Sequence, residues 1–295
     1  MLKSFLLLVF MLISYTAYAE LTIMTSTTSL QMIAKEVGGK EVTVKSLTPP
    51  DRDTHYIQAR PSIIHALRSA DIVMAVGADL EIGWLPLAIQ SSTNPKIQPG
   101  QTGYFEAANY VKLLESSKPA DRSQGDVHPA GNPHFTLDPG RIPIIAKALA
   151  KRLGEIDTER KTYYDKNAQN IAEKITPRIE KWQSQRQSSR LDGVITYHSN
   201  ALYLLDRFNI KRLGSIEPLP GIPPTAKHIA NLVKANKNKK GVIIRSPYHQ
   251  AGSTNRLAKA LEWQSHVLPS EPPLNSSLND YLKFIDEWLK VLVAN

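Results

Sequence analysis

The sequence contains no cysteine among its 295 residues. This absence excludes disulfide bonds, thiolate metal sites, iron–sulfur clusters, cysteine nucleophiles and a lipid anchor on an N-terminal cysteine. Any metal must therefore be bound by His, Asp, Glu or water. The sequence also lacks the Gly-x-Gly-x-x-Gly and Gly-x-x-x-x-Gly-Lys phosphate-binding motifs, the Gly-x-Ser-x-Gly elbow and the His-Glu-x-x-His motif. These absences argue against nucleotide-binding proteins, hydrolases and zinc proteases.

Acidic residues are fewer than basic ones, 27 against 36, which gives a formal net charge of +9. A basic balance is common in nucleic-acid-binding proteins. Here, however, the basic residues are scattered, and the one dense patch, residues 234–240, lies between a predicted helix and a predicted strand. A solvated turn explains that patch, and we expect no nucleic-acid partner.

Long hydrophobic runs are absent except near the N-terminus. Lys3 precedes an apolar run over residues 5–13, and an Ala-Tyr-Ala end follows at residues 17–19. This order is typical of a cleavable secretory signal, and the run is shorter than the ~20 residues that a membrane-spanning helix needs. We expect residues 1–19 to be removed, which leaves a periplasmic protein that is soluble and not lipid-anchored.

The remaining chain alternates short apolar runs with amphipathic stretches. The runs are rich in β-branched residues and predict strands at 21–24, 42–46, 72–76, 194–197, 211–215, 242–245 and 266–268. The amphipathic stretches predict helices at 29–37, 61–69, 142–153, 200–208, 225–235, 253–261 and 278–293. This alternation predicts an α/β fold with two α/β lobes and mostly parallel sheets.

One polar segment separates the two series. Apolar residues recur there at three- and four-residue steps, which predicts a single long helix. Pro177 lies inside it, so we expect either a kink or a break near Thr176. We therefore divide the mature chain into an N-terminal lobe (20–156), a linking helix (157–189) and a C-terminal lobe (190–295).

Three of the eight histidines are candidate metal ligands. In parallel α/β sheets, ligands gather beyond the carboxyl ends of the strands. His198 directly follows a strand, His55 lies in the loop beyond another, and His134 lies in a Gly/Pro-rich loop. A cleft between the lobes would bring them together, and three neutral imidazoles suit Zn²⁺ with a carboxylate or water as fourth ligand. A surface or capping role is the alternative for each.

The other histidines are less favoured as metal ligands. His249 lies beyond the strand 242–245 and is a minor candidate, whereas for His128 a loop role is favoured over metal capture. Structural roles are expected for His65, His228 and His266.

At the three candidate histidines the chain resembles the zinc- and manganese-binding periplasmic receptors of bacterial ABC transporters. The similar stretches are Asp53-Thr54-His55 with Pro61-Ser62, Asn132-Pro133-His134 with Leu137-Asp138-Pro139, and Tyr197-His198 with Tyr203. The resemblance implies two lobes joined by a rigid helix, a metal held between them by His55, His134 and His198, no enzymatic activity, and delivery to a membrane permease. We expect a monomer. Histidine rather than glutamate at position 198 points to Zn²⁺, with Mn²⁺ less favoured.

The chain departs from the family pattern in two places. The segment Ser116–Gly131 holds only His128, where zinc receptors often carry a long His-rich loop. The family's fourth ligand is an aspartate, but Pro269 stands at that place, so Glu271 or water would complete the site.

Further expectations concern the surroundings of the ligands. Ser, Asn or backbone carbonyl groups should hold the outer ring nitrogens, with Glu81 and Asp138 as alternative acids. Because the imidazoles must be neutral to bind, affinity should fall below pH ~6.5.

Three alternative functions use the same histidines. One is a receptor for manganese or another divalent metal. Another is a zinc hydrolase in which Glu271 acts as general base. The last is an adhesin in which the metal is structural.

Overall fold

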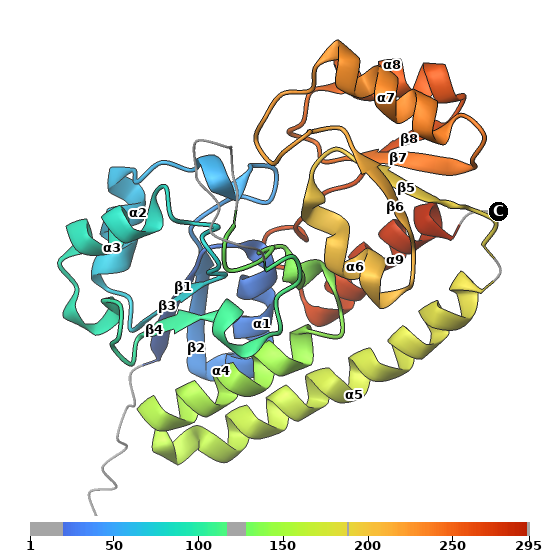
Figure 1. Cartoon of the computed structure of the whole chain (residues 1–295). Coiled ribbons are helices and arrows are strands. Elements are labelled where there is room, and N and C mark those ends of the chain that lie inside the picture. Colours follow the sequence, from blue (N-terminus) through green and yellow to red (C-terminus); the bar gives the residue numbers. More distant parts are fainter. Residues whose placement is uncertain (1–19, 117–127, 188, 294–295) are drawn as a thin grey trace, which may run out of the picture.

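The computed structural model describes residues 20–116, 128–187 and 189–293. Two α/β lobes lie side by side, and one long helix runs along both of them (Figure 1). The predicted fold class is confirmed. The predicted signal sequence, residues 1–19, lies outside the described residues. Within the described ranges, no helix is both long and apolar enough to cross a membrane.

The N-terminal lobe is built on a sheet of four parallel strands in the order β2-β1-β3-β4. Its strands are β1 (Leu21–Thr25), β2 (Val42–Ser46), β3 (Ile72–Ala75) and β4 (Tyr104–Glu106). Its helices are α1 (Thr28–Gly38), α2 (Pro61–Arg68), α3 (Leu85–Ser92) and α4 (Ile142–Ile156). Helix α1 begins where the Thr27 hydroxyl accepts a hydrogen bond from the Leu30 N–H, and it ends at Gly39, whose φ is +56°.

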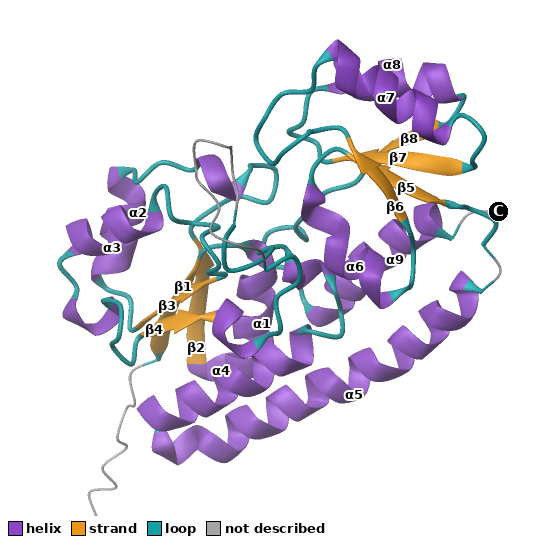
Figure 2. Cartoon of the chain, viewed as in Figure 1, coloured by secondary structure: helices purple, strands orange, loops and turns teal. Residues whose placement is uncertain are grey.

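The C-terminal lobe repeats this arrangement with the order β6-β5-β7-β8, again all parallel. Its strands are β5 (Gly193–Thr196), β6 (Arg212–Ser215), β7 (Gly241–Arg245) and β8 (Gln264–Val267). Its helices are α6 (Leu202–Arg207), α7 (Ala226–Asn236), α8 (Ala251–Leu261) and α9 (Leu278–Leu292). In both lobes helices flank the sheet (Figure 2).

Two elements were not predicted from the sequence. Strand β4 has three residues, of which only Phe105 is buried, so it is too short to show a recognisable alternation in the sequence. Helix α3 has no clean apolar stripe, because Leu87 in its middle is 58% exposed.

The long helix is α5 (Lys161–Arg186), which lies within the predicted linking segment. It continues through Pro177, so of the two alternatives near Thr176, a kink or a break, the structure excludes the break. Beside the proline, the Thr176 hydroxyl donates to the Ala172 carbonyl four residues earlier over 2.9 Å. Tyr164 and Trp182 are buried near its two ends.

Helix α5 is not the only connection between the lobes. One hydrophobic core runs through both, and α9 packs on α1 as well as on α5. The Tyr281 hydroxyl donates to the Thr136 carbonyl over 2.9 Å, and Nε of Arg207 donates to Oδ1 of Asp138 over 2.7 Å. These buried contacts hold the lobes in one relative position.

Candidate metal site

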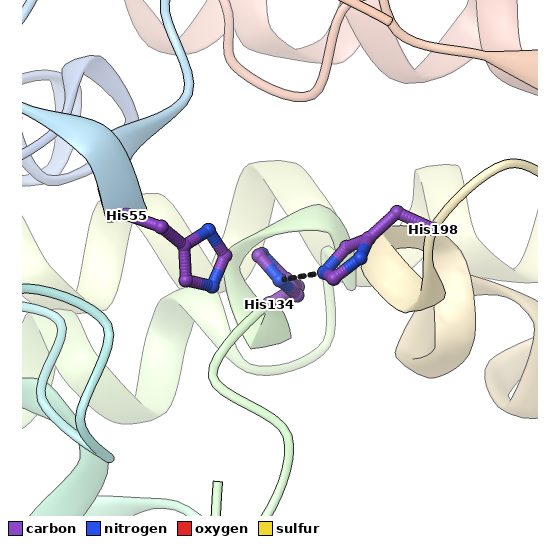
Figure 3. Close-up of side chains that lie close together, drawn as sticks. All are labelled: His55, His134 and His198. Carbon is purple, nitrogen blue, oxygen red and sulfur yellow. Dashed lines mark hydrogen bonds between the residues drawn. The ribbon is translucent and has the colours of Figure 1, made fainter. Parts of the chain in front are cut away.

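Three imidazoles meet between the lobes (Figure 3). His55 lies in a short 3-10 turn (Thr54–Tyr56) beyond β2, His134 precedes another (Phe135–Leu137), and His198 follows β5. One ring nitrogen from each lies within 4.8 Å of the others, and the Nε2 atoms of His134 and His198 are 3.1 Å apart. The structure therefore brings together all three predicted histidines.

The spacing of these atoms fits a tetrahedral metal ion. Zinc binds imidazole nitrogen at ~2.0–2.1 Å, so two ligand nitrogens on one ion lie ~3.4 Å apart. One pair, His134 and His198, is at 3.1 Å, and all three nitrogens lie within 4.8 Å of one another. Small side-chain shifts would bring all three nitrogens onto one ion.

Two of the rings are held from behind by carboxylates. Oδ1 of Asp53 lies 2.7 Å from Nδ1 of His55, and Oε2 of Glu217 lies 2.8 Å from Nδ1 of His198. An ionised carboxylate only accepts, so each Nδ1 donates and each neutral ring keeps its lone pair on Nε2. The prediction that Ser, Asn or backbone carbonyls hold these nitrogens is wrong for both rings.

Glu217 was missed by the sequence analysis. It lies two residues after the end of β6, so it stands at the same edge of the sheet as His198. The rule that located the histidines would also have located this acid.

The pKa values of Asp53 and His134 are both lowered, for different reasons. Burial opposes ionisation of Asp53, but hydrogen bonds and the positive charge of His55 outweigh it and lower the pKa of the carboxyl. Burial and the neighbouring histidines lower the pKa of His134 well below 6.5. His134 therefore stays neutral, and able to bind a metal, below the pH at which an ordinary histidine titrates.

The backbone around His134 is fixed from the other lobe. Its N–H donates to Oδ1 of Asn132 over 2.9 Å. The Asn132 amide in turn donates to the Ser199 carbonyl over 3.0 Å, and the Asn132 carbonyl accepts from Tyr203 over 2.6 Å. Both partners lie just after His198, so the loops that carry His134 and His198 are tied together.

Two more histidines lie near the cluster. Nε2 of His128 is 3.1 Å from Nε2 of His55. His128 therefore contacts a candidate ligand and does not lie apart from the site in its loop. The His249 ring stacks on Tyr197, with centroids 4.2 Å apart, and its Nδ1 accepts from the Ser246 N–H. Burial, and then the charge of His198, lower the pKa of His249 to about 4.

The acids that were candidates for the site have other partners. Oε2 of Glu271 accepts from the Ser29 N–H over 2.7 Å at the start of α1. Glu81 accepts from the Val76 and Gly77 N–H groups beyond β3. Asp138 pairs with Arg141 and Arg207. In the described part of the chain, the metal-ligand group consists of the three histidines alone.

The remaining histidines lie outside the group, as expected. His65 is exposed on α2, and His266 belongs to β8. Nε2 of His228 contacts the Ser215 carbonyl at 2.8 Å.

A cavity of about 490 Å³ opens beside the cluster. It is lined by Asp53, Tyr56, His198, Glu217 and His249, among others. This cavity gives a hydrated ion room to approach the ligands.

Comparison with known proteins places this arrangement among metal-uptake proteins. The family model described as "Zinc-uptake complex component A periplasmic" matches residues 23–295. A metal ABC transporter substrate-binding lipoprotein of Streptococcus mutans is 28% identical over 163 residues, 54% of this chain, and the match spans half of that relative's length. The high-affinity zinc uptake system protein of Yersinia pestis is 21% identical over 295 residues, covering 91% of this chain and 89% of the relative.

Solved structures share the fold. The crystal structure of a zinc-uptake component A protein superposes with a TM-score of 0.76 at 18% identity, covering 92% of this chain and 99% of that one. A solute-binding protein of Pseudomonas aeruginosa in complex with Ni²⁺ gives a TM-score of 0.77 at 20% identity, covering 92% and 95%.

Proposed function

Because this chain belongs to the family of periplasmic zinc-uptake complex component A proteins, we propose that it is a receptor that captures Zn²⁺ and delivers it to an ABC-type import permease. The ligands are His55, His134 and His198. The observation that carries the proposal is the meeting of these three side chains, from separate loops of both lobes, with their nitrogens within 4.8 Å.

The donor set favours zinc over manganese. Zn²⁺ accepts imidazole nitrogens in a tetrahedral site, whereas Mn²⁺ prefers oxygen donors and more of them. Relatives include a manganese transporter lipoprotein of Streptococcus pneumoniae, 26% identical over 162 residues, and an iron-binding protein of Yersinia pestis, 26% identical over 226 residues. Manganese is therefore the competitor that an experiment must include.

The same proposal includes where the protein is located in the cell. Cleavage after Ala19 releases the mature protein, residues 20–295, into the periplasm without a lipid anchor. There it binds metal as a monomer and docks on the permease. The lobes share a core, so release depends on the permease more than on a wide opening of the protein.

The enzyme alternative loses its main support. A hydrolase needs a general base beside the metal-bound water. Glu271, the residue considered for that role, accepts hydrogen bonds from Ser29 and Thr28 at the start of α1.

A chelator-competition titration of the metal-free mature protein with Zn²⁺ and Mn²⁺ tests the proposal. We expect one Zn²⁺ per chain, bound more tightly than Mn²⁺, and loss of that binding in His198→Ala. His65→Ala, on the exposed face of α2, is the matched control and should bind as the wild type does. Binding that is indifferent to His198, or tighter for Mn²⁺, would overturn the proposal.

A further inference from the structure

The Nε2 atoms at the site form two close pairs. One pair is His134 with His198 at 3.1 Å, and the other is His55 with His128, also at 3.1 Å. The His128 ring centroid lies 5.2 Å from that of His55 and 6.4 Å from that of His134. His128 therefore contacts His55 directly, and a shift of its ring toward His134 and His198 would add it to the three-histidine group.

In each pair, one ring has a carboxylate as hydrogen-bond acceptor at its Nδ1, and this fixes the state of its Nε2. Nδ1 of His55 donates to Asp53, so the Nε2 that faces His128 carries a lone pair when the ring is neutral. Nδ1 of His198 donates to Glu217, so the Nε2 that faces His134 also carries one. Both of these Nε2 lone pairs are therefore available to a cation that binds between the rings.

The loop that would otherwise supply the fourth ligand has no group to offer. Pro269 has no polar side-chain atom. The Ser270 hydroxyl lies within hydrogen-bonding distance of Asn200 and Ser246, at 2.6 and 2.7 Å. The Glu271 carboxylate is engaged at the start of α1.

We propose that His128 is the fourth metal ligand, which completes an all-imidazole tetrahedral site. This inference rests on the proposed function, since it names a further ligand of the same site. Four neutral donors leave the 2+ charge of the ion uncompensated within the ligand set. The carboxylates of Asp53 and Glu217 accept hydrogen bonds from two of the rings. Their two negative charges balance the charge of the ion.

A site of this kind selects its cargo by chemistry. Imidazole suits Zn²⁺, Ni²⁺ and Cu²⁺, whereas Mn²⁺, Mg²⁺ and Ca²⁺ prefer carboxylate, carbonyl and water oxygens. The site therefore takes a nitrogen-preferring divalent transition metal, and His128 contributes to the rejection of Mn²⁺.

The test combines affinity with a direct count of ligands. In the zinc-loaded mature protein, X-ray absorption at the zinc edge should show four imidazoles, and in His128→Ala three imidazoles with one oxygen. Zinc affinity should fall roughly 10- to 100-fold in His128→Ala, the loss that is typical when a hydrogen-bond partner of a metal ligand is removed. Zinc affinity should be unchanged in His65→Ala. His128→Asp restores a fourth ligand as oxygen, so it should recover zinc binding and narrow the preference for Zn²⁺ over Mn²⁺.

The outcomes separate the two proposals. Three imidazoles in the wild type, or equal zinc affinity in wild type and His128→Ala, would overturn the role of His128. The receptor proposal would still be supported if His198→Ala loses zinc binding. A wild-type protein that binds no zinc would overturn both.

Discussion

The carboxylate of Glu217 accepts a hydrogen bond from Nδ1 of His198 over 2.8 Å, which joins the end of β6 to the end of β5. The two strands are neighbours in the sheet, so the fold itself sets this contact. It orients the ring and fixes which nitrogen carries the proton.

Removing this carboxylate should weaken metal binding. We expect zinc affinity to fall roughly 10- to 100-fold in Glu217→Ala, because the ring loses its partner, its orientation and a nearby negative charge. Glu217→Gln keeps an oxygen acceptor and should lose less. Chelator-competition titration measures both variants, and Glu173→Gln on the exposed surface of α5 serves as control. Equal affinities in all four proteins would show that the contact is incidental.

A second prediction concerns the connection between the lobes at Asp138. This side chain is fully buried and receives hydrogen bonds from Arg207 and Gly140, besides its pair with Arg141. Asp138→Asn leaves two arginines without their counter-charge, and we expect about 3 kcal/mol less unfolding free energy. Urea unfolding of the metal-free protein measures the change. Asp165→Asn removes an exposed pair with Lys161 and should cost under about 0.5 kcal/mol. Similar costs for both variants would contradict this account.

A third prediction concerns Pro177 in α5. Proline there leaves a backbone carbonyl one turn earlier without its helical donor. Pro177→Ala restores that donor, while the freer unfolded chain offsets part of the gain. We expect a net increase in unfolding free energy of about 2 kcal/mol, measured by urea denaturation. A loss of stability would mean that the packing of α5 on α4 and α9 requires the local geometry that proline imposes.

The fourth prediction is a pH dependence. Burial raises the pKa of Glu271 above 4.5, although hydrogen bonds from Ser29 and Thr28 oppose the shift. The native state then binds a proton more readily than the unfolded state, so this residue's contribution to stability falls as pH rises from about 4.5 through the raised pKa. Glu271→Gln can still accept from Ser29 but does not titrate. Its unfolding free energy relative to the wild type should therefore increase between pH 4 and pH 7.

Urea unfolding of both proteins across this pH range provides the measurement. The metal-free protein should be used, so that ligand binding does not contribute. A difference between the two proteins that stays constant with pH, or decreases, would refute the assignment to Glu271.

The parts that sequence reasoning could reach are those set by local pattern. The buried strands and the helices follow from short local runs of the sequence, and His55 and His198 follow from the rule that ligands gather beyond strand ends. The position of His128 beside His55 depends on the path of a loop without a repeating pattern, so the sequence does not determine it. The contact of Glu271 with Ser29 requires knowing how the lobes pack, since the residues are 242 positions apart.

The packing of α9 on α1 has a consequence for the assembly of the molecule. The Leu278 N–H donates to Oε1 of Glu36, a contact that joins the first helix of the fold to its last. A chain is synthesised from its N-terminus, so α1 can pack on β2, α4 and α5 well before α9, its partner from the far end of the chain, exists. Contacts of such long sequence separation slow folding. The contact between α1 and α9 therefore forms only when almost the whole chain is available, and we expect a chain that ends before α9 to bind the ion more weakly.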